Sequence, residues 1–186
     1  MDLHRQNTVC PRVIPFHLDD WASAAEAFKK STPVYLGQHW LPQPEAGFLP
    51  ARVRTAWTDN ALLVLAELDD AGIFNPSREF NAPAFKMGDS FEIFLRPLDQ
   101  DAYYEFHIGP DNQKFQLRVP SAKAFRELPK GDIPQEWLIG NQVIESRAKV
   151  LAQENRWLAL ASIPFAMVAE ARHPEAGSQW LFSFSR

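Results

Sequence analysis

The stretch that decides the fold runs from Gly88 to Val119 and reads GDSFEIFLRPLDQDAYYEFHIGPDNQKFQLRV. It holds three short segments in which apolar and polar residues alternate, namely Ser90 to Arg96, Ala102 to Gly109 and Lys114 to Val119. Turn-forming residues separate them, and this pattern is typical of short strands joined by tight connections. The stretch therefore predicts a three-stranded antiparallel meander.

Side chains alternate across a strand, so each predicted strand has an apolar and a mixed face. We expect the apolar face to be core, built from Phe91, Ile93, Leu95, Tyr104, Phe106, Ile108, Phe115, Leu117 and Val119. The opposite face carries Glu92, Glu105, His107, Gln116 and Arg118, with Phe94 and Tyr103 between them. Such a face is either a solvated exterior or a polar binding surface.

Outside the meander, further alternating segments predict more strands. They are Thr8 to Val13, Val34 to Gln38, Ala51 to Trp57, Ala61 to Leu68, Asn141 to Gln153, Trp157 to Ile163 and Trp180 to Arg186. Helical spacing is sustained only from Trp21 to Lys29, after the capping pair Asp19-Asp20. Pro120 to Gly140 reads as irregular. Eight to ten strands and one short N-terminal helix predict an all-β chain, an antiparallel β-sandwich that forms a single domain over residues 1–186.

Composition narrows the classes of partner. The net charge of −4, without a cluster of Lys and Arg, argues against nucleic acid, because phosphate binding needs a basic surface. No apolar run approaches the length of a membrane span, and residues 1–15 lack the continuous apolar stretch of a signal peptide. Aromatic residues make up 12% of the chain, which suits both a sheet protein and stacking on planar ligands.

Sequence motifs of catalysis are absent: there is no glycine-rich phosphate loop, GxSxG elbow or HExxH pair. The stronger signal is geometric. A hairpin turn centred near Asp99 places Glu92 beside His107 on one face, where a carboxylate and an imidazole can bond adjacent hydroxyls. Arg118 and Gln116 would widen this polar patch. The same pair could equally be a cross-strand charge pair on a solvated face.

Loops and strand ends supply further candidates. Trp40 and Trp137 lie in proline-rich or irregular regions that can expose a ring for stacking. Asp69 and Asp70 end a predicted strand, where hard oxygen ligands can hold calcium, although acidic strand ends are more commonly solvated.

Several runs, in this order, resemble the motifs of the family 9 carbohydrate-binding modules: WTDNALLVLAELDD, GDSFEIFLRP, YYEFHIGPD, the apolar strand before Ile163-Pro164-Phe165, and WLFSFSR. Together they span Arg52 to Arg186, and DSFEIFL with YYEFHI is the most specific part. The resemblance implies an immunoglobulin-like β-sandwich that binds glycan chain ends or small sugars. It also implies an accessory role beside secreted glycoside hydrolases, an extracellular or periplasmic location, and a structural calcium ion in some members.

The resemblance also assigns roles to residues. The carboxylate of the family's DSxEIF motif corresponds to Glu92, and His107 stands where the family has an arginine on the adjacent strand. Phe85 lies near the position of an aromatic residue, usually tryptophan, and Ser185 occupies a polar position of the last core strand. The family's second clamping tryptophan lies beyond that strand, whereas this sequence ends at Arg186.

The leading hypothesis is a non-catalytic carbohydrate-binding domain that requires no cofactor. In it Glu92, His107 and Arg118 bond sugar hydroxyls, and Phe85, Trp40 or Trp137 stacks on a pyranose ring. A glycoside hydrolase is the expected protein partner. One alternative is a structural or protein-interaction domain that keeps the fold without sugar binding, or a subunit of a larger enzyme. The other is a glycoside hydrolase with two reactive carboxylates.

Overall fold

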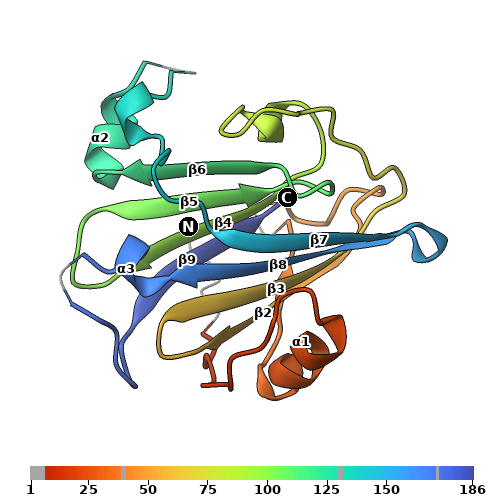
Figure 1. Ribbon diagram of the computed structural model, residues 1–186. Coiled ribbons are helices and arrows are strands. Elements are labelled where there is room, and N and C mark those ends of the chain that lie inside the picture. Colours follow the sequence, from red (N-terminus) through yellow and green to blue (C-terminus); the bar gives the residue numbers. More distant parts are fainter. Residues whose placement is uncertain (1–6, 39–40, 130–131, 171) are drawn as a thin grey trace.

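Two antiparallel sheets face each other in the computed structural model, which describes residues 7–38, 41–129, 132–170 and 172–186 (Figure 1). The five-stranded sheet has the order β1 (Val34–Leu36), β2 (Ala51–Trp57), β3 (Ala61–Asp69), β8 (Arg156–Pro164) and β7 (Glu145–Leu151). The four-stranded sheet has the order β6 (Lys114–Val119), β5 (Tyr103–Ile108), β4 (Phe91–Pro97) and β9 (Trp180–Ser185). The predicted antiparallel β-sandwich and its central meander are thus confirmed.

Helices are short and peripheral. The N-terminal helix α1 (Trp21–Ala27) continues into the 3-10 turn η1 (Phe28–Lys30), as the sequence predicts. Its first turn is capped by the Asp20 carboxylate, which accepts hydrogen bonds from two backbone amides. The remaining helical pieces are α2 (Ala122–Glu127), α3 (Phe165–Val168), η2 (Ala84–Lys86), η3 (Gln135–Trp137) and η4 (Ala152–Glu154).

Two sequence predictions about elements are wrong. Thr8 to Val13 forms no strand but a single parallel bridge from Arg12 to Trp57, in which the Val13 amide donates to the Trp57 carbonyl. The region from Pro120 to Gly140, predicted irregular, contains α2, whose Ser121 hydroxyl accepts from the Ala124 amide. No residue of α2 is buried, so this helix lacks the apolar stripe that sequence periodicity detects.

The main hydrophobic core lies between the sheets. Aromatic residues from the four-stranded sheet, including Phe91, Tyr104 and Phe106, pack there against Trp157 and Ile163 of β8. A second core lies on the other face of the five-stranded sheet, which α1 and η1 cover; its buried members are Leu18, Ala24, Phe28, Ala56, Leu63, Leu65 and Leu160. Both faces of β3 and β8 are therefore buried, which explains their nearly continuous apolar sequences. Among the described residues, no helix is long and apolar enough to cross a membrane.

The third meander strand faces the opposite way from the sequence prediction. His107 pairs directly with Phe115, so Phe115, Leu117 and Val119 lie on the outer face of the four-stranded sheet and not on the face between the sheets. They are buried there because Phe85, Trp137 and neighbouring loop residues cover them; the cluster as a whole is Phe85, Tyr103, Phe115, Leu117, Val119, Ile133, Trp137 and Leu138. Apolar alternation shows that one face of this strand is buried, but not which one.

Gln116 and Arg118 consequently lie on the inter-sheet side of β6. The Gln116 amide is fully buried; it donates to the Gln142 carbonyl over 2.8 Å and accepts from the Ile144 amide over 2.8 Å. Arg118 forms a bidentate ion pair with Glu170, at 2.5 and 3.0 Å. Specific partners thus satisfy both polar groups on the side where the sequence predicts core.

Candidate functional site

Three polar side chains form a row across the outer face of the four-stranded sheet, one from each of β9, β4 and β5. Glu92 is directly paired with Ser185 on one side and with His107 on the other. The Ser185 hydroxyl donates to Glu92 Oε2 over 2.7 Å, and Glu92 Oε1 lies 3.8 Å from His107 Nδ1. The predicted adjacency of Glu92 and His107 is confirmed, and Ser185 joins them.

His107 is buried without a hydrogen bond to either ring nitrogen from the described residues. Its side chain is only 4% exposed, and its Nε2 atom lies 3.4 Å from Glu105 Oε2. Three rings surround the imidazole: the centroids of Phe85 and Phe115 are 5.1 Å away, and that of Phe94 is 6.0 Å away. A buried polar group without a hydrogen-bond partner lowers the stability of the fold by about 1–3 kcal/mol. Such a group therefore indicates a place where a water molecule or a ligand binds.

Glu105 extends the row along β5. It lies two residues before His107 on the same face and is buried, and its side chain is 10% exposed. Tyr103 is also on this face. Burial raises the pKa of the Tyr103 phenol, and the neighbouring Glu105 carboxylate raises it further, so the phenol stays protonated and can donate. Glu105 and Tyr103 therefore continue the polar surface beyond the row, so that hydrogen-bond donors and acceptors are mixed along Ser185, Glu92, His107, Glu105 and Tyr103.

A small cavity of about 170 Å³ opens beside Glu92, where the chain enters β4. Its lining combines carboxylates, rings and one guanidinium, from Asp70, Phe85, Gly88, Asp89, Ser90, Glu92, Trp157 and Arg186. Ser90 is 5% exposed, and its hydroxyl oxygen has no hydrogen-bond partner among the described residues. The cavity thus contains an unpartnered buried hydroxyl next to the carboxylate of the row.

The carboxylates of this cavity interact with one another. Burial raises the pKa of Asp89, and the nearby Asp70 carboxylate raises it further, while a hydrogen bond from the Phe74 amide opposes both effects. Arg186 Nη2 lies 3.0 Å from Asp70 Oδ2 and so balances part of the negative charge. Because Arg186 offsets the charge of Asp70 and burial disfavours the charged form of Asp89, the cavity suits a polar, uncharged ligand better than a strong anion.

The structure brings together four of the predicted site residues: Phe85, Glu92, His107 and Ser185. Arg118 is a correction, because it lies on the other face of the sheet and is bound to Glu170. Trp137 is half-buried in the cluster that covers β6, on the same face as the row but within the apolar cover. Trp40 lies outside the described residues.

Phe85 contacts the site through its edge. Its ring meets His107 at an interplanar angle of 74° and Phe115 at 62°, and the Lys86 ammonium lies 5.7 Å from its centroid. The ring therefore forms part of the roof over His107 as well as part of the cavity lining.

Asp69 and Asp70 do not fit a calcium site. Asp69 Oδ1 accepts from Arg156 Nε over 2.6 Å, and Asp70 Oδ2 accepts from Arg186. Calcium needs 6 to 8 oxygen ligands, whereas each of these carboxylates already faces a guanidinium. Within residues 7–38, 41–129, 132–170 and 172–186, no three His, Cys, Asp or Glu residues form a group that could hold a metal ion.

The sequence prediction omitted Asp89, Ser90 and Arg186. Asp89 and Ser90 directly precede the strand that carries Glu92, three and two residues before it, and Arg186 directly follows Ser185. The run DS before FEIF was the available signal for the first two. No local signal connects Arg186 with Asp70, because their contact spans the two sheets.

The chain is thus an all-β sandwich with one polar row on the outer face of its smaller sheet. The fold is that of the family 9 carbohydrate-binding modules. It is similar to the module from Caldicellulosiruptor kristjanssonii solved in complex with cellotriose, with a TM-score of 0.55 and 18% identity, covering 94% of this chain and 73% of that one.

A crystal structure from Bacteroides uniformis, provisionally described as a carbohydrate-binding protein, has a TM-score of 0.67 and 13% identity. This similarity covers 94% of the present chain and 80% of the other. No family model and no curated protein sequence matches the chain. At these identities the similarity establishes the fold, and the ligand has to be argued from the site.

Proposed function

We propose that this chain is a non-catalytic carbohydrate-binding domain whose site is the row Ser185, Glu92, His107 together with the adjoining cavity. The observation that carries the proposal is the buried, unpartnered imidazole of His107 beside the Glu92 carboxylate. A sugar hydroxyl both donates and accepts, so it can bridge a carboxylate and an imidazole that lie side by side. The fold shared with a module solved in complex with cellotriose supports the same ligand class.

Aromatic contact should decide the affinity. Each hydrogen bond to a sugar replaces one to water and contributes only about 0.5–1.5 kcal/mol. Two rings line the cavity beside Glu92: Phe85 is half-buried, whereas Trp157 is fully buried. One half-buried ring gives a smaller stacking surface than a ring on each side of the sugar, so we expect weak binding.

The accessory role is part of the same proposal. A weak, non-catalytic site contributes to polysaccharide breakdown by holding a hydrolase near its substrate, since linked binding and catalytic modules gain from effective concentration. The expected partner is therefore a glycoside hydrolase. Reducing-end analysis after incubation of the chain with cellotriose tests the non-catalytic part; release of glucose or cellobiose would contradict it.

Calorimetric titration with cellotriose and with D-glucose tests the site. Wild type should bind, and Glu92→Ala should lose the binding event that belongs to this row while its thermal melt stays close to that of wild type, because the Glu92 side chain is not part of the apolar core. Arg118→Ala is the matched control, since Arg118 belongs to the same sheet but points to its other face. Equal binding by wild type and Glu92→Ala would remove this row as the site.

A further inference from the structure

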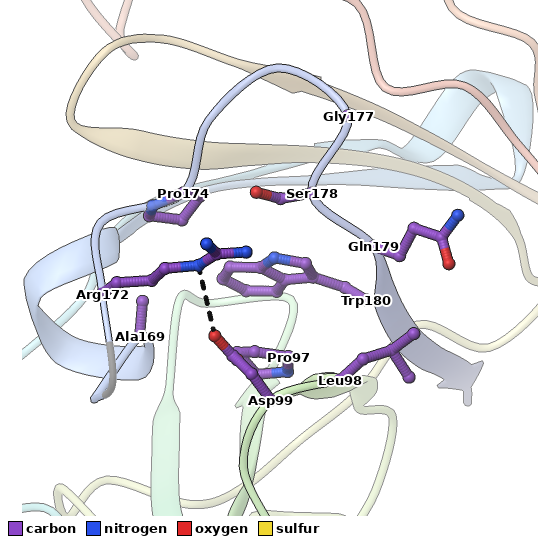
Figure 2. Close-up of a pocket in the computed structure, with 10 residues that line it drawn as sticks. All are labelled: Pro97, Leu98, Asp99, Ala169, Arg172, Pro174, Gly177, Ser178, Gln179 and Trp180. Carbon is purple, nitrogen blue, oxygen red and sulfur yellow. Dashed lines mark ion pairs between the residues drawn. The ribbon is translucent and has the colours of Figure 1, made fainter.

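Figure 2 shows the residues that line a second cavity, of about 260 Å³. It lies at the opposite end of β4 and β9 from the row that contains Glu92. Glu92 pairs with Ser185 at one end of these strands, and Pro97 pairs with Trp180 at the other. Glu92 and Pro97 are five positions apart along β4, which corresponds to roughly 17 Å along a strand. The cavity is therefore a separate site, between the β4–β5 turn and the loop that leads from α3 to β9.

One wall of this cavity is an aromatic ring. The Trp180 indole is half-buried and is held edge-on by Phe165, with centroids 5.9 Å apart and an interplanar angle of 62°. Figure 2 shows the indole directed into the space between Arg172 and Asp99. A half-buried ring that a second ring holds in place can stack on a ligand with little loss of conformational entropy.

Two planar charged groups line the same space. Arg172 Nε lies 3.6 Å from Asp99 Oδ2, which is longer than a hydrogen bond, and the side chains are 74% and 42% exposed. Both groups therefore keep most of their hydrogen-bonding capacity for a ligand. Their opposite charges nearly cancel, so the cavity favours neither a cation nor an anion.

The loop before β9 forms the cavity wall opposite the β4–β5 turn, and backbone hydrogen bonds hold this loop in place. The Ser178 amide donates to the Glu175 carbonyl over 3.0 Å, across a turn in which Gly177 has a φ of +92°. The Ser178 hydroxyl accepts from the Glu175 amide over 2.9 Å and retains its own proton for a ligand oxygen. A bond of 3.2 Å from the Leu98 amide to the Gln179 carbonyl joins this wall to the β4–β5 turn.

We propose that this cavity is a second sugar site, which binds one neutral pyranose. The apolar face of the sugar lies on the Trp180 indole, and two adjacent hydroxyls bridge the Arg172 guanidinium and the Asp99 carboxylate. Ser178 donates to a third sugar oxygen. The site shares no residue with the row that contains Glu92, so it stands or falls independently of that row.

Nuclear magnetic resonance locates binding at each site separately. The probes are D-glucose, D-galactose and D-mannose, with D-glucuronate as the charged comparison. The Trp180 indole N–H and the Ser178 amide should shift with at least one neutral sugar and less with D-glucuronate; Trp180→Leu assigns the indole signal among the six tryptophans. Absence of any such shift, or a stronger response to D-glucuronate, would overturn the proposal.

Arg172→Ala provides the second test, because an exposed arginine can be truncated without loss of fold. It should weaken the neutral-sugar response at Trp180 by at least about tenfold in Kd, while Arg126→Ala, an exposed arginine on α2, should not. An unchanged response in Arg172→Ala contradicts the site. In Glu92→Ala the Trp180 response should persist. In wild type, a response at Trp180 without one at Ser185 would refute the proposed function and leave this inference standing.

Discussion

The strand pairing predicted from the sequence gives the correct position of His107, but it does not reveal the surroundings of the imidazole. Sequence spacing predicts its position beside Glu92. The structure adds that no described residue forms a hydrogen bond with either ring nitrogen, and that three phenyl rings enclose the imidazole. Leaving a buried polar group unsatisfied lowers the stability of the unliganded domain, and a ligand hydroxyl would restore the lost hydrogen bond. The cost is therefore expected at a binding site.

Glu170 predicts a pH-dependent contribution to stability. Its hydrogen bonds with Arg118, and the hydrogen bond that it accepts from Tyr104, lower its pKa below the usual 4.5. A carboxylate with a lowered pKa in the folded state stabilises above its unfolded pKa, and the contribution disappears as pH falls through the folded value. Glu170→Gln should thus have a lower melting temperature than wild type at pH 7.

The difference in melting temperature between wild type and Glu170→Gln should become smaller as the pH is lowered below about 4.5. Thermal melts of wild type and Glu170→Gln across this range check the prediction, because Tyr104 and Arg118, whose pKa values Glu170 raises, stay protonated throughout it. A difference that is constant with pH would show that Glu170 acts through packing and not through its charge.

Phe106 tests the main core. It is fully buried on β5, and its ring stacks on that of Tyr104 with centroids 6.3 Å apart. Phe106→Ala removes the ring and leaves a cavity, so the free energy of unfolding should fall by about 3–5 kcal/mol. Urea denaturation measures the change; a loss below about 1 kcal/mol would mean that the core collapses around the gap or that the ring is not enclosed.

At the scale of elements, the loop between β3 and β4 forms the candidate site only by approaching the start of β4 closely. The Asp89 amide donates to the Phe74 carbonyl over 2.9 Å, and a Cβ on Gly88 would lie 2.3 Å from that same carbonyl oxygen. Backbone atoms cannot move aside as a flexible side chain can. The close contact with the Phe74 carbonyl therefore requires a residue without a Cβ at position 88. Gly88 also lines the cavity beside Glu92.

Gly88→Ala should lower the free energy of unfolding by about 1–3 kcal/mol and weaken sugar binding, because the loop must move away from β4. Gly72→Ala is the matched control in the same loop, since a Cβ there meets nothing within 4 Å. Chemical denaturation and calorimetric titration of both variants check the prediction. Equal behaviour of the two variants would contradict it.

At the scale of the whole molecule, ion pairs join the ends of the two sheets. Arg186, directly after β9, donates to the Asp69 carbonyl over 2.5 Å and to Asp70 Oδ2 over 3.0 Å, at the end of β3. Arg156 on β8 holds the Asp69 carboxylate within its own sheet. These guanidinium groups occupy the oxygens that a calcium ion would need.

We therefore expect the melting temperature to be the same in calcium and in chelator. A protein that binds an ion only when folded is stabilised by that ion, so differential scanning calorimetry in both conditions is a direct measurement. A rise in melting temperature with calcium, abolished in Asp69→Asn, would restore the calcium site that the sequence predicts at Asp69 and Asp70.

The sequence by itself determined the meander, the pairing of Glu92 with His107 and the sandwich. These features follow from the alternation of apolar and polar residues and from turn residues, and both signals can be read within each short segment. Only the tertiary structure decided which face of β6 is core. An edge strand covered by loops buries its apolar side wherever the cover lies, and Phe85 and Trp137 come from distant segments.

The cavity beside Glu92 needed Asp70, Asp89 and Arg186 brought together from three places in the chain, and the Trp180 cavity needed a turn and a loop separated by about 70 residues. Such contacts follow from how two sheets pack, which no local pattern specifies.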